Sequence, residues 1–284
     1  MNNEKHDSVM TGDGVEIHYR EAGEGQVLVM LPGFSQSAAE FDKQLDGLGI
    51  SRRVLALDHR GHGESAKPAH GYRIARLAAD LQDFLLALDL SEVTLLGHSL
   101  GCTVVWSYWD LYGGDRIKRI ILVDQGPIGL KELAQGAPAE QRGAIFTFEQ
   151  ALHIATGLRN DQYLQTSRTV VDMMHTPELS DAEAEWILRQ NLLLPRKHAA
   201  TLHLDYCGSD WRDVLPRITL PTLVIGGAAS FIPPDVAEGT ARRIPGAVSR
   251  IFSAAEKGSH LMFRENAALF NSVVSRFMEG DTVR

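Results

Sequence analysis

The stretch Gly97-His98-Ser99-Leu100-Gly101 decides how this 284-residue chain folds. It follows an apolar run, Val93-Thr94-Leu95-Leu96, that predicts a buried strand, and it precedes Cys102 to Leu111, which can form a helix. A strand that turns so tightly into a helix strains the backbone of its middle residue, and small residues two positions to either side keep strand and helix from colliding. The pattern therefore predicts a serine hydroxyl held above a sheet, with the N–H of the next residue aimed at the same point.

Apolar strands and amphipathic helices alternate on both sides of this motif. The expected strands cover residues 15–20 (as an edge strand), 26–31, 53–57, 93–96, 117–123, 222–225 and 248–252. The expected helices cover residues 74–88, 102–111 and 234–243 and a last segment that begins near 266–269. This alternation is typical of an α/β fold, a mostly parallel central sheet with helices on both faces. Ligands of such sheets bind outside the carboxyl ends of the strands, where the polar motifs of this chain fall.

The alternation lapses for about ninety residues between Asp124 and Pro221, a stretch rich in helix-forming residues. We interpret it as a helical lid, or cap, inserted into the core. The expected division is a core of residues 1–125 and 216–284 and a lid of residues 126–215. Six lid aromatics are candidates to roof an apolar pocket, with Trp186 chosen as a substrate-binding residue: Phe146, Phe148, Tyr163, Trp186, Tyr206 and Trp211.

Composition and charge exclude several classes of protein. The two cysteines, Cys102 and Cys207, give no disulfide framework, and no dinucleotide fingerprint, phosphate loop or zinc-ligand pattern is present. We therefore expect no cofactor and no metal. The net charge of −8 and the lack of a basic stripe argue against nucleic acid and anionic membranes. With no secretory signal and no run of eighteen apolar residues, we expect a cytoplasmic protein whose partner is a small-molecule substrate, in an oligomeric state left open.

Six motifs in order carry a resemblance to a known family. They are Leu31-Pro32-Gly33-Phe34, Asp58-His59-Arg60-Gly61-His62-Gly63, Gly97-His98-Ser99-Leu100-Gly101, Leu122-Val123-Asp124, Pro221-Thr222-Leu223-Val224-Ile225 and Gly258-Ser259-His260. Over essentially its whole length the chain resembles the lidded, serine-nucleophile branch of the α/β-hydrolase family. The resemblance implies a nucleophile elbow at Ser99 and a base at His260, which follows the last strand. It also implies an oxyanion hole of the backbone N–H groups of Phe34 and Leu100, with Phe34 touching the substrate.

The acid of the expected catalytic triad departs from the usual pattern of this family. Most members place it in Gly-x-x-Asp after the strand that corresponds to residues 222–225, and this chain has Gly227-Ala228-Ala229-Ser230 there. A minority draws the acid from the end of the preceding strand, where this chain has Asp124. Asp124 is our candidate for the acid. The alternatives are Asp235, which looks like a residue at the start of a helix, and a site without a functional acid.

These residues predict acyl transfer to water, in which Ser99 attacks a carbonyl and His260 carries the proton. Serine at position 99 argues against dehalogenase and epoxide hydrolase chemistry, for which this fold uses an aspartate nucleophile. The lid favours a small, largely apolar ester, lactone or thioester, so we expect a serine esterase or lactonase. Two alternatives stay open: a cofactor-free dioxygenase of a quinolone-like heterocycle that uses only a His–Asp dyad, and a small-molecule receptor with slow turnover.

Overall fold

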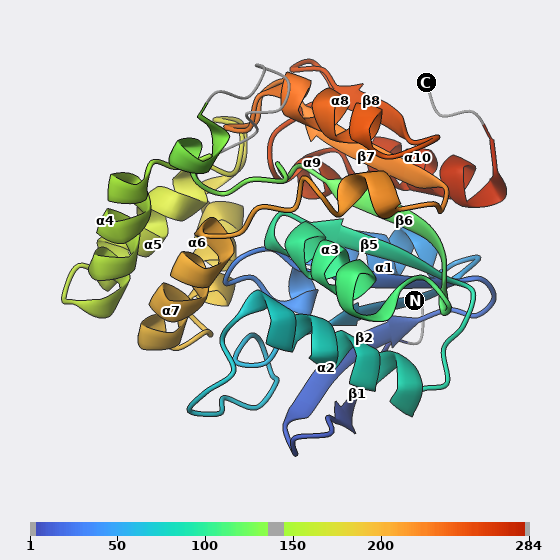
Figure 1. The fold of residues 1–284 in the computed structure, drawn as a ribbon, viewed down its shortest axis with the longest axis horizontal. Helices are drawn as coiled ribbons and strands as arrows, with labels where there is room; N and C mark the ends of the chain where they lie inside the picture. Colours follow the sequence, from blue (N-terminus) through green and yellow to red (C-terminus); the bar gives the residue numbers. More distant parts are fainter. Residues whose placement is uncertain (1–3, 136–144, 282–284) are drawn as a thin grey trace.

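The computed structural model describes residues 4–135 and 145–281, and within them eight strands form one sheet in the order β1-β2-β4-β3-β5-β6-β7-β8 (Figure 1). The strand β2 is antiparallel to both β1 and β4, and every other pair is parallel. The predicted α/β class with a mostly parallel sheet is confirmed. The strands are β1 (Lys5–Met10), β2 (Glu16–Ala22), β3 (Val27–Leu31), β4 (Arg53–Leu57), β5 (Val93–His98), β6 (Ile117–Val123), β7 (Thr222–Gly227) and β8 (Val248–Phe252).

Helices cover both faces of this sheet because the central strands are apolar on both faces. In β3, Val29 and Leu31 belong to one buried cluster, while Leu28 and Met30 belong to the other, as the two-residue period of a strand requires. The first cluster includes residues of α2 (Ile74–Ala87), α3 (Leu100–Tyr112) and α8 (Pro234–Arg243). The second includes residues of α1 (Asp42–Leu48), α9 (Met262–Glu265) and α10 (Ala267–Glu279).

Among the described residues, four α-helices follow one another between β6 and β7, and Figure 1 shows them to one side of the sheet. Two of them begin at good capping residues: the Thr147 hydroxyl accepts from the Gln150 amide, and the Ser180 hydroxyl accepts from the Glu183 amide. The division of the chain at residues 126 and 215 stays a prediction. The four helices are α4 (Phe148–Arg159), α5 (Tyr163–Asp172), α6 (Asp181–Asn191) and α7 (Arg196–Cys207).

The strand expected at the sheet edge has a neighbour that the sequence did not reveal. The strand β2 lies between β4 and β1, and β1 forms the edge. The residues Lys5, His6 and Asp7 of β1 are exposed, so its sequence lacks the apolar period of a buried strand.

Among the described residues, no helix is both long and apolar enough to cross a membrane.

Candidate active site

Ser99 occupies the tight turn between β5 and α3. Its φ of 51° lies in the left-handed region that non-glycine residues rarely adopt. A Cβ at Gly97 would lie 2.5 Å from the backbone carbon of Gly101, and a Cβ at Gly101 would lie 2.3 Å from the Leu31 oxygen. The two glycines are therefore required for the close approach of strand and helix that fixes Ser99.

His260 and Asp124 meet across the carboxyl edge of the sheet. Asp124 directly follows β6, and His260 lies in the connection between β8 and α9. The His260 Nδ1 atom lies 2.6 Å from Asp124 Oδ2, and both side chains are buried. With Nδ1–H donating to the carboxylate, Nε2 is left free to accept a proton. The alternative acid, Asp235, is exposed in the first turn of α8.

The surroundings of His260 keep its imidazole uncharged. Burial is the largest influence and lowers the pKa of His260 below its ordinary value, and the nearby His98 ring acts in the same direction. The hydrogen bond to Asp124 opposes this shift without overcoming it. The Phe231 ring, 4.7 Å from the His260 ring between centroids, covers it on the pocket side. A neutral imidazole at neutral pH is the form that a general base requires.

The two residues expected to donate backbone N–H groups, Phe34 and Leu100, lie in the loop after β3 and at the start of α3. Phe34 lines the same pocket as Ser99, and among the residues that the structure describes none accepts a hydrogen bond from its amide. Ser35, buried at a φ of 60°, donates its hydroxyl to the Asn191 carbonyl oxygen at 2.7 Å and accepts from Arg196 at 2.9 Å. The end of α6 and the start of α7 thus hold this loop in place. Leu100 is the first residue of α3, where amides lack partners within the helix.

A buried Glu40–His98 pair lies beneath the site. Glu40 Oε1 accepts from the Gly33 amide at 3.0 Å and lies 3.0 Å from His98 Nδ1. The other ring nitrogen of His98 lies 3.1 Å from the His260 carbonyl oxygen. The pair therefore ties the Phe34 loop to the His260 loop. The sequence showed His98 only as a neighbour of Ser99 and gave no signal for Glu40.

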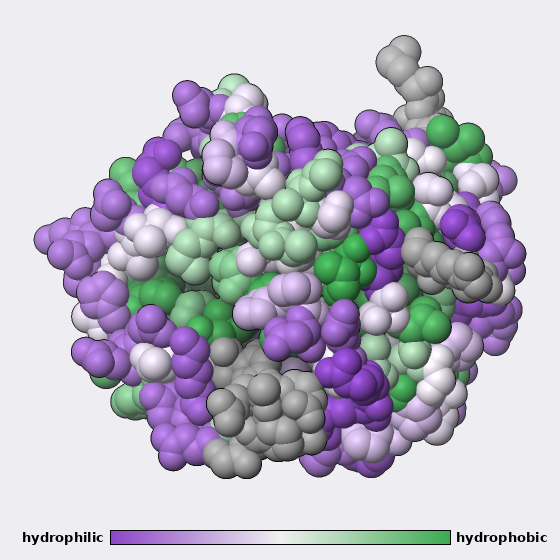
Figure 2. All heavy atoms as spheres, turned by 90° about the horizontal axis from the view of Figure 1, so that it is seen from above, coloured by the Kyte–Doolittle hydropathy of each residue, from purple (hydrophilic) through white to green (hydrophobic). Residues whose placement is uncertain are grey.

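An apolar pocket opens onto Ser99 and His260, and Figure 2 shows apolar side chains among hydrophilic ones on the face seen from above. The structure corrects one expectation: Trp186 does not line this pocket but packs beneath the Arg264 guanidinium, 4.2 Å from its ring centroid. Phe146 and Tyr206 are the two lid aromatics, of the six expected, that line it. The remaining lining residues are Phe34, Ile145, Ile154, Val170, Met173, Met174, His203 and Phe231.

Comparison with known proteins places the chain in a family. The model of the family described as alpha/beta hydrolase fold matches residues 26–267. The chain belongs to this family. It is 27% identical over 284 residues to a non-heme haloperoxidase of Rhodococcus erythropolis, a match that covers 95% of this chain and 98% of that protein.

Solved structures of alpha/beta hydrolases share the fold. An esterase from Exiguobacterium antarcticum superposes with a TM-score of 0.88 at 23% identity, covering 97% of this chain and all of the other. The enol-lactonase from Burkholderia xenovorans LB400 gives a TM-score of 0.82 at 22% identity, covering 96% of this chain and all of the other. At these identities the likeness concerns the fold alone.

Ser230 stands at the position where most alpha/beta hydrolases carry the acid, and it contacts Asp124. The Ser230 hydroxyl donates to Asp124 Oδ2, the same oxygen that receives the His260 ring N–H. The Ser230 oxygen also accepts from the Ile232 amide at 3.1 Å, which fixes its orientation. Ser230 thus reaches from the end of β7 to the carboxylate at the end of β6. The sequence indicated a vacant acid position and did not reveal this contact.

The helix α7 brings the hydroxyl of Tyr206 to the pocket that contains Ser99. Tyr206 of α7 donates its hydroxyl to Gln125 Oε1 at 2.9 Å, and the Ser99 side chain also interacts with it. Burial raises the pKa of Tyr206, so the phenol stays protonated. Cys102, in contrast, is buried in α3 with a raised pKa and donates to the Gly97 carbonyl oxygen, so it packs and does not present a nucleophile.

Proposed function

We propose that this alpha/beta hydrolase is a serine hydrolase that cleaves a small, largely apolar carboxylic ester or lactone through an acyl-enzyme on Ser99. The 2.6 Å hydrogen bond between His260 and Asp124 carries the proposal, because His260 lines the same pocket as Ser99. A free serine hydroxyl is a poor nucleophile at neutral pH and needs a positioned base. The neutral, oriented imidazole of His260 supplies that base.

In the proposed mechanism, Ser99 Oγ attacks the carbonyl carbon of the substrate and His260 Nε2 takes the hydroxyl proton. Asp124 stabilises the imidazolium that forms and keeps its ring in one tautomer. The amides of Phe34 and Leu100 hold the negative oxygen of the tetrahedral intermediate, where one such donor contributes about 3 kcal/mol. His260 then protonates the leaving oxygen and activates a water molecule, which releases the acyl group from Ser99.

The lining of the pocket supports the choice of substrate. The only side chains in it with ionisable groups are two histidines and one tyrosine, and no lysine, arginine, aspartate or glutamate is among the described residues that line it. Burial lowers the pKa of His203 to about 4, so this ring is neutral near neutral pH. A charged acyl chain would lose its hydration without gaining a partner. We therefore expect uncharged esters and lactones to be preferred over their carboxylate-bearing analogues.

A serine-directed fluorophosphonate probe tests the proposal. We expect one label per chain on Ser99, no label on Ser99→Ala, and hydrolysis of p-nitrophenyl acetate that the probe abolishes. A panel of short esters and lactones, with hydrogen peroxide offered in place of water as acyl acceptor, then defines the reaction. Absence of labelling together with absence of ester turnover would overturn the proposal.

The buried His260–Asp124 pair also favours one second candidate, a cofactor-free dioxygenase in which the dyad deprotonates the substrate and Ser99 is not acylated. Oxygen consumption on a quinolone by Ser99→Ala would indicate this reaction. Ligand-dependent recruitment of a protein partner, without turnover of ester or quinolone, would instead indicate the small-molecule receptor.

A further inference from the structure

Two histidines and a carboxylate converge at the edge of the sheet, apart from the residues that line the pocket. His6 lies on β1 and His18 on β2, and Glu64 lies in the turn after β4. The His18 Nε2 atom lies 3.3 Å from His6 Nδ1 and 3.6 Å from Glu64 Oε2, and all three atoms lie within 4.8 Å of one another. We propose that His6, His18 and Glu64 bind one divalent transition-metal ion, with Zn²⁺ as the best match.

The spacing of the three atoms suits this ion. Nitrogen and oxygen ligands lie about 2.0–2.2 Å from zinc in a tetrahedral site, which sets neighbouring ligand atoms roughly 3.3–3.6 Å apart. The two separations from His18 Nε2, 3.3 Å and 3.6 Å, fall in this range. A set of two imidazoles and one carboxylate favours zinc over calcium or magnesium. Three protein ligands leave a fourth position for water.

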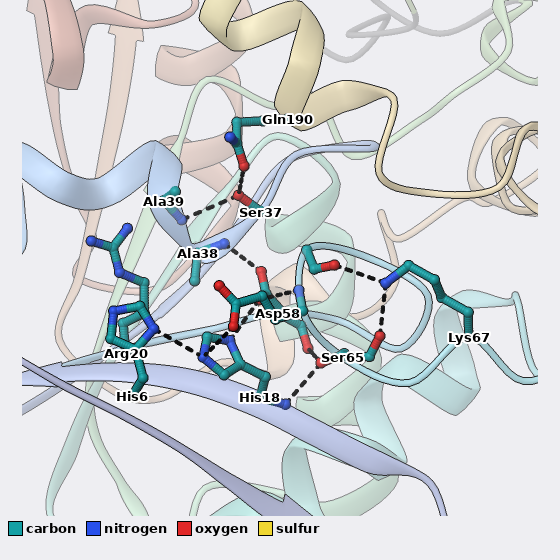
Figure 3. Close-up of polar contacts among 12 residues, drawn as sticks. His6, His18, Arg20, Ser37, Ala38, Ala39, Asp58, Ser65, Lys67 and Gln190 are labelled. Carbon is teal, nitrogen blue, oxygen red and sulfur yellow. Dashed lines mark hydrogen bonds and ion pairs between the residues drawn. The ribbon is translucent and has the colours of Figure 1, made fainter.

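Each histidine has a carboxylate on its other nitrogen. The His18 Nδ1 atom lies 2.8 Å from Asp58 Oδ2, and Figure 3 shows the His18 ring between Asp58 and the His6 ring. His6 Nε2 lies 3.4 Å from Glu4 Oε1. Carboxylates in these positions fix the tautomer of a metal-binding histidine, so that its second nitrogen turns a lone pair toward the ion. Nε2 of His18 and Nδ1 of His6, the two nitrogens that face each other, are thus the ones freed to bind metal.

The surrounding groups keep His18 in place without a metal. Asp58 is buried and also accepts from the Ala38 and Glu64 amides, so the supporting carboxylate and the backbone of Glu64 are held together. Arg20, a cation whose charge acts on His18, forms ion pairs with Glu4 and Asp42, which reduces its repulsion of a bound ion. The side chains of His6 and Glu64 are 49% and 69% exposed, which leaves a path for the ion from solvent.

A bound ion would join three segments that are distant in the sequence. It would fasten the edge strand β1 to β2 and both to the turn after β4. Binding to the folded chain alone stabilises it, so the midpoint of thermal unfolding should rise with zinc concentration. The ligands are spread over residues 6–64 and follow no short spacing motif, which is why the sequence showed no zinc-ligand pattern.

The test uses the full chain without an affinity tag, treated with a chelator and then titrated with Zn²⁺ by calorimetry. We expect one ion per chain and a higher unfolding midpoint in its presence. His6→Ala and Glu64→Ala remove exposed side chains, so both variants should fold and bind Zn²⁺ at least about 10-fold more weakly. Co²⁺ in place of Zn²⁺ should give the visible absorption of a tetrahedral site, lost in the same variants.

His70→Ala is the matched control, because His70 is exposed and does not belong to the cluster. It should bind zinc like the unmodified chain. The proposal is overturned if titration to millimolar zinc shows no stoichiometric binding, or if His6→Ala and Glu64→Ala bind as tightly as His70→Ala. None of these readouts depends on the proposed hydrolase activity.

Discussion

The carboxyl ends of β6 and β7 lie side by side, and one carries the acceptor and the other the donor of a single hydrogen bond. The two strands are parallel, with Val123 opposite Ile225. The end of β6 carries the carboxylate of Asp124, and the loop after β7 carries the hydroxyl of Ser230 that donates to it. Asp124 has a φ of 53°, a left-handed conformation that aspartate tolerates better than most residues. The two strand ends therefore meet at one carboxylate oxygen, the same oxygen that lies next to His260 Nδ1.

The largest expected effect tests the β6 side of this comparison. Asp124→Asn keeps the shape of the side chain but removes the charge that stabilises the imidazolium and favours the wrong tautomer of His260. We expect kcat for ester hydrolysis to fall by about 10⁴, as for the same change in a serine protease triad. Steady-state kinetics with circular dichroism as a check of folding measure this.

Asp235→Asn is the matched control for that substitution, because Asp235 is the next carboxylate after β7 and is exposed at the start of α8. It should leave kcat within about 2-fold and cost at most a small fraction of helix stability. A large loss in Asp235→Asn with near-normal activity in Asp124→Asn would contradict the assignment of the acid.

Moving the charge from one strand end to the other is the second test. Ser230 Oγ and His260 Nδ1 bond to the same oxygen of Asp124, so a carboxylate at position 230 would project toward the imidazole. In Asp124→Asn/Ser230→Asp we expect kcat to recover at least about 10-fold over Asp124→Asn, since hydrogen bonds to charged groups contribute about 1.5–3 kcal/mol. Recovery no greater than that of Asp124→Asn/Ser230→Asn would show that the β7 end cannot supply the charge.

Ser230→Ala has a smaller expected effect on the same comparison. It removes one donor from Asp124 Oδ2, so the carboxylate attracts the His260 proton more strongly and the pKa of His260 should rise. We expect kcat to fall by about 3- to 10-fold and the acidic limb of the pH–rate profile to move to higher pH. Ser230→Thr keeps the hydroxyl and should retain the unmodified profile. If the acidic limb of the pH–rate profile does not move in Ser230→Ala, Ser230 has a structural role only.

Much of the sheet could be predicted because its strands are buried on both faces and therefore apolar throughout. The expected strand at 53–57 and helix at 234–243 match β4 and α8 residue for residue. The edge strand β1 could not be found in this way, since its exposed residues carry no apolar signal. The pairing of β1 with β2 depends on hydrogen bonds between backbones, which the side chains of such a segment do not encode.

Part of the candidate site could likewise be predicted from the sequence, and part could not. The motifs at Ser99, Asp124 and His260 placed these residues at one edge of the sheet, because each follows a strand and the strand ends share that edge; there, Asp124 contacts His260, and Ser99 lines the same pocket as His260. The pocket walls could be predicted only in part: Phe34, Phe146 and Tyr206 were among the candidates and line the pocket, whereas Trp186 does not. Trp186 lies on α6 and Tyr206 on α7, and only the packing of those helices decides that Tyr206 lines the pocket with Ser99 while Trp186 packs against Arg264. The Ser230 contact depends on a loop geometry that no spacing encodes.

The smallest expected effect is on the pH dependence of the unmodified chain, which depends on the pKa of His260. Burial lowers this pKa in the folded chain, so the neutral base persists at pH values where an ordinary histidine, near 6.5, is half protonated. Activity should therefore be lost only as the pH falls below about 6.5, through the lowered pKa of the folded state. The pH dependence of kcat/KM for a neutral ester, whose own charge does not change, measures this directly. An acidic limb centred above pH 6.5 would mean that Asp124 raises the pKa of His260 by more than burial lowers it. The β6 carboxylate would then affect this pKa more strongly than its shared contact with Ser230 implies.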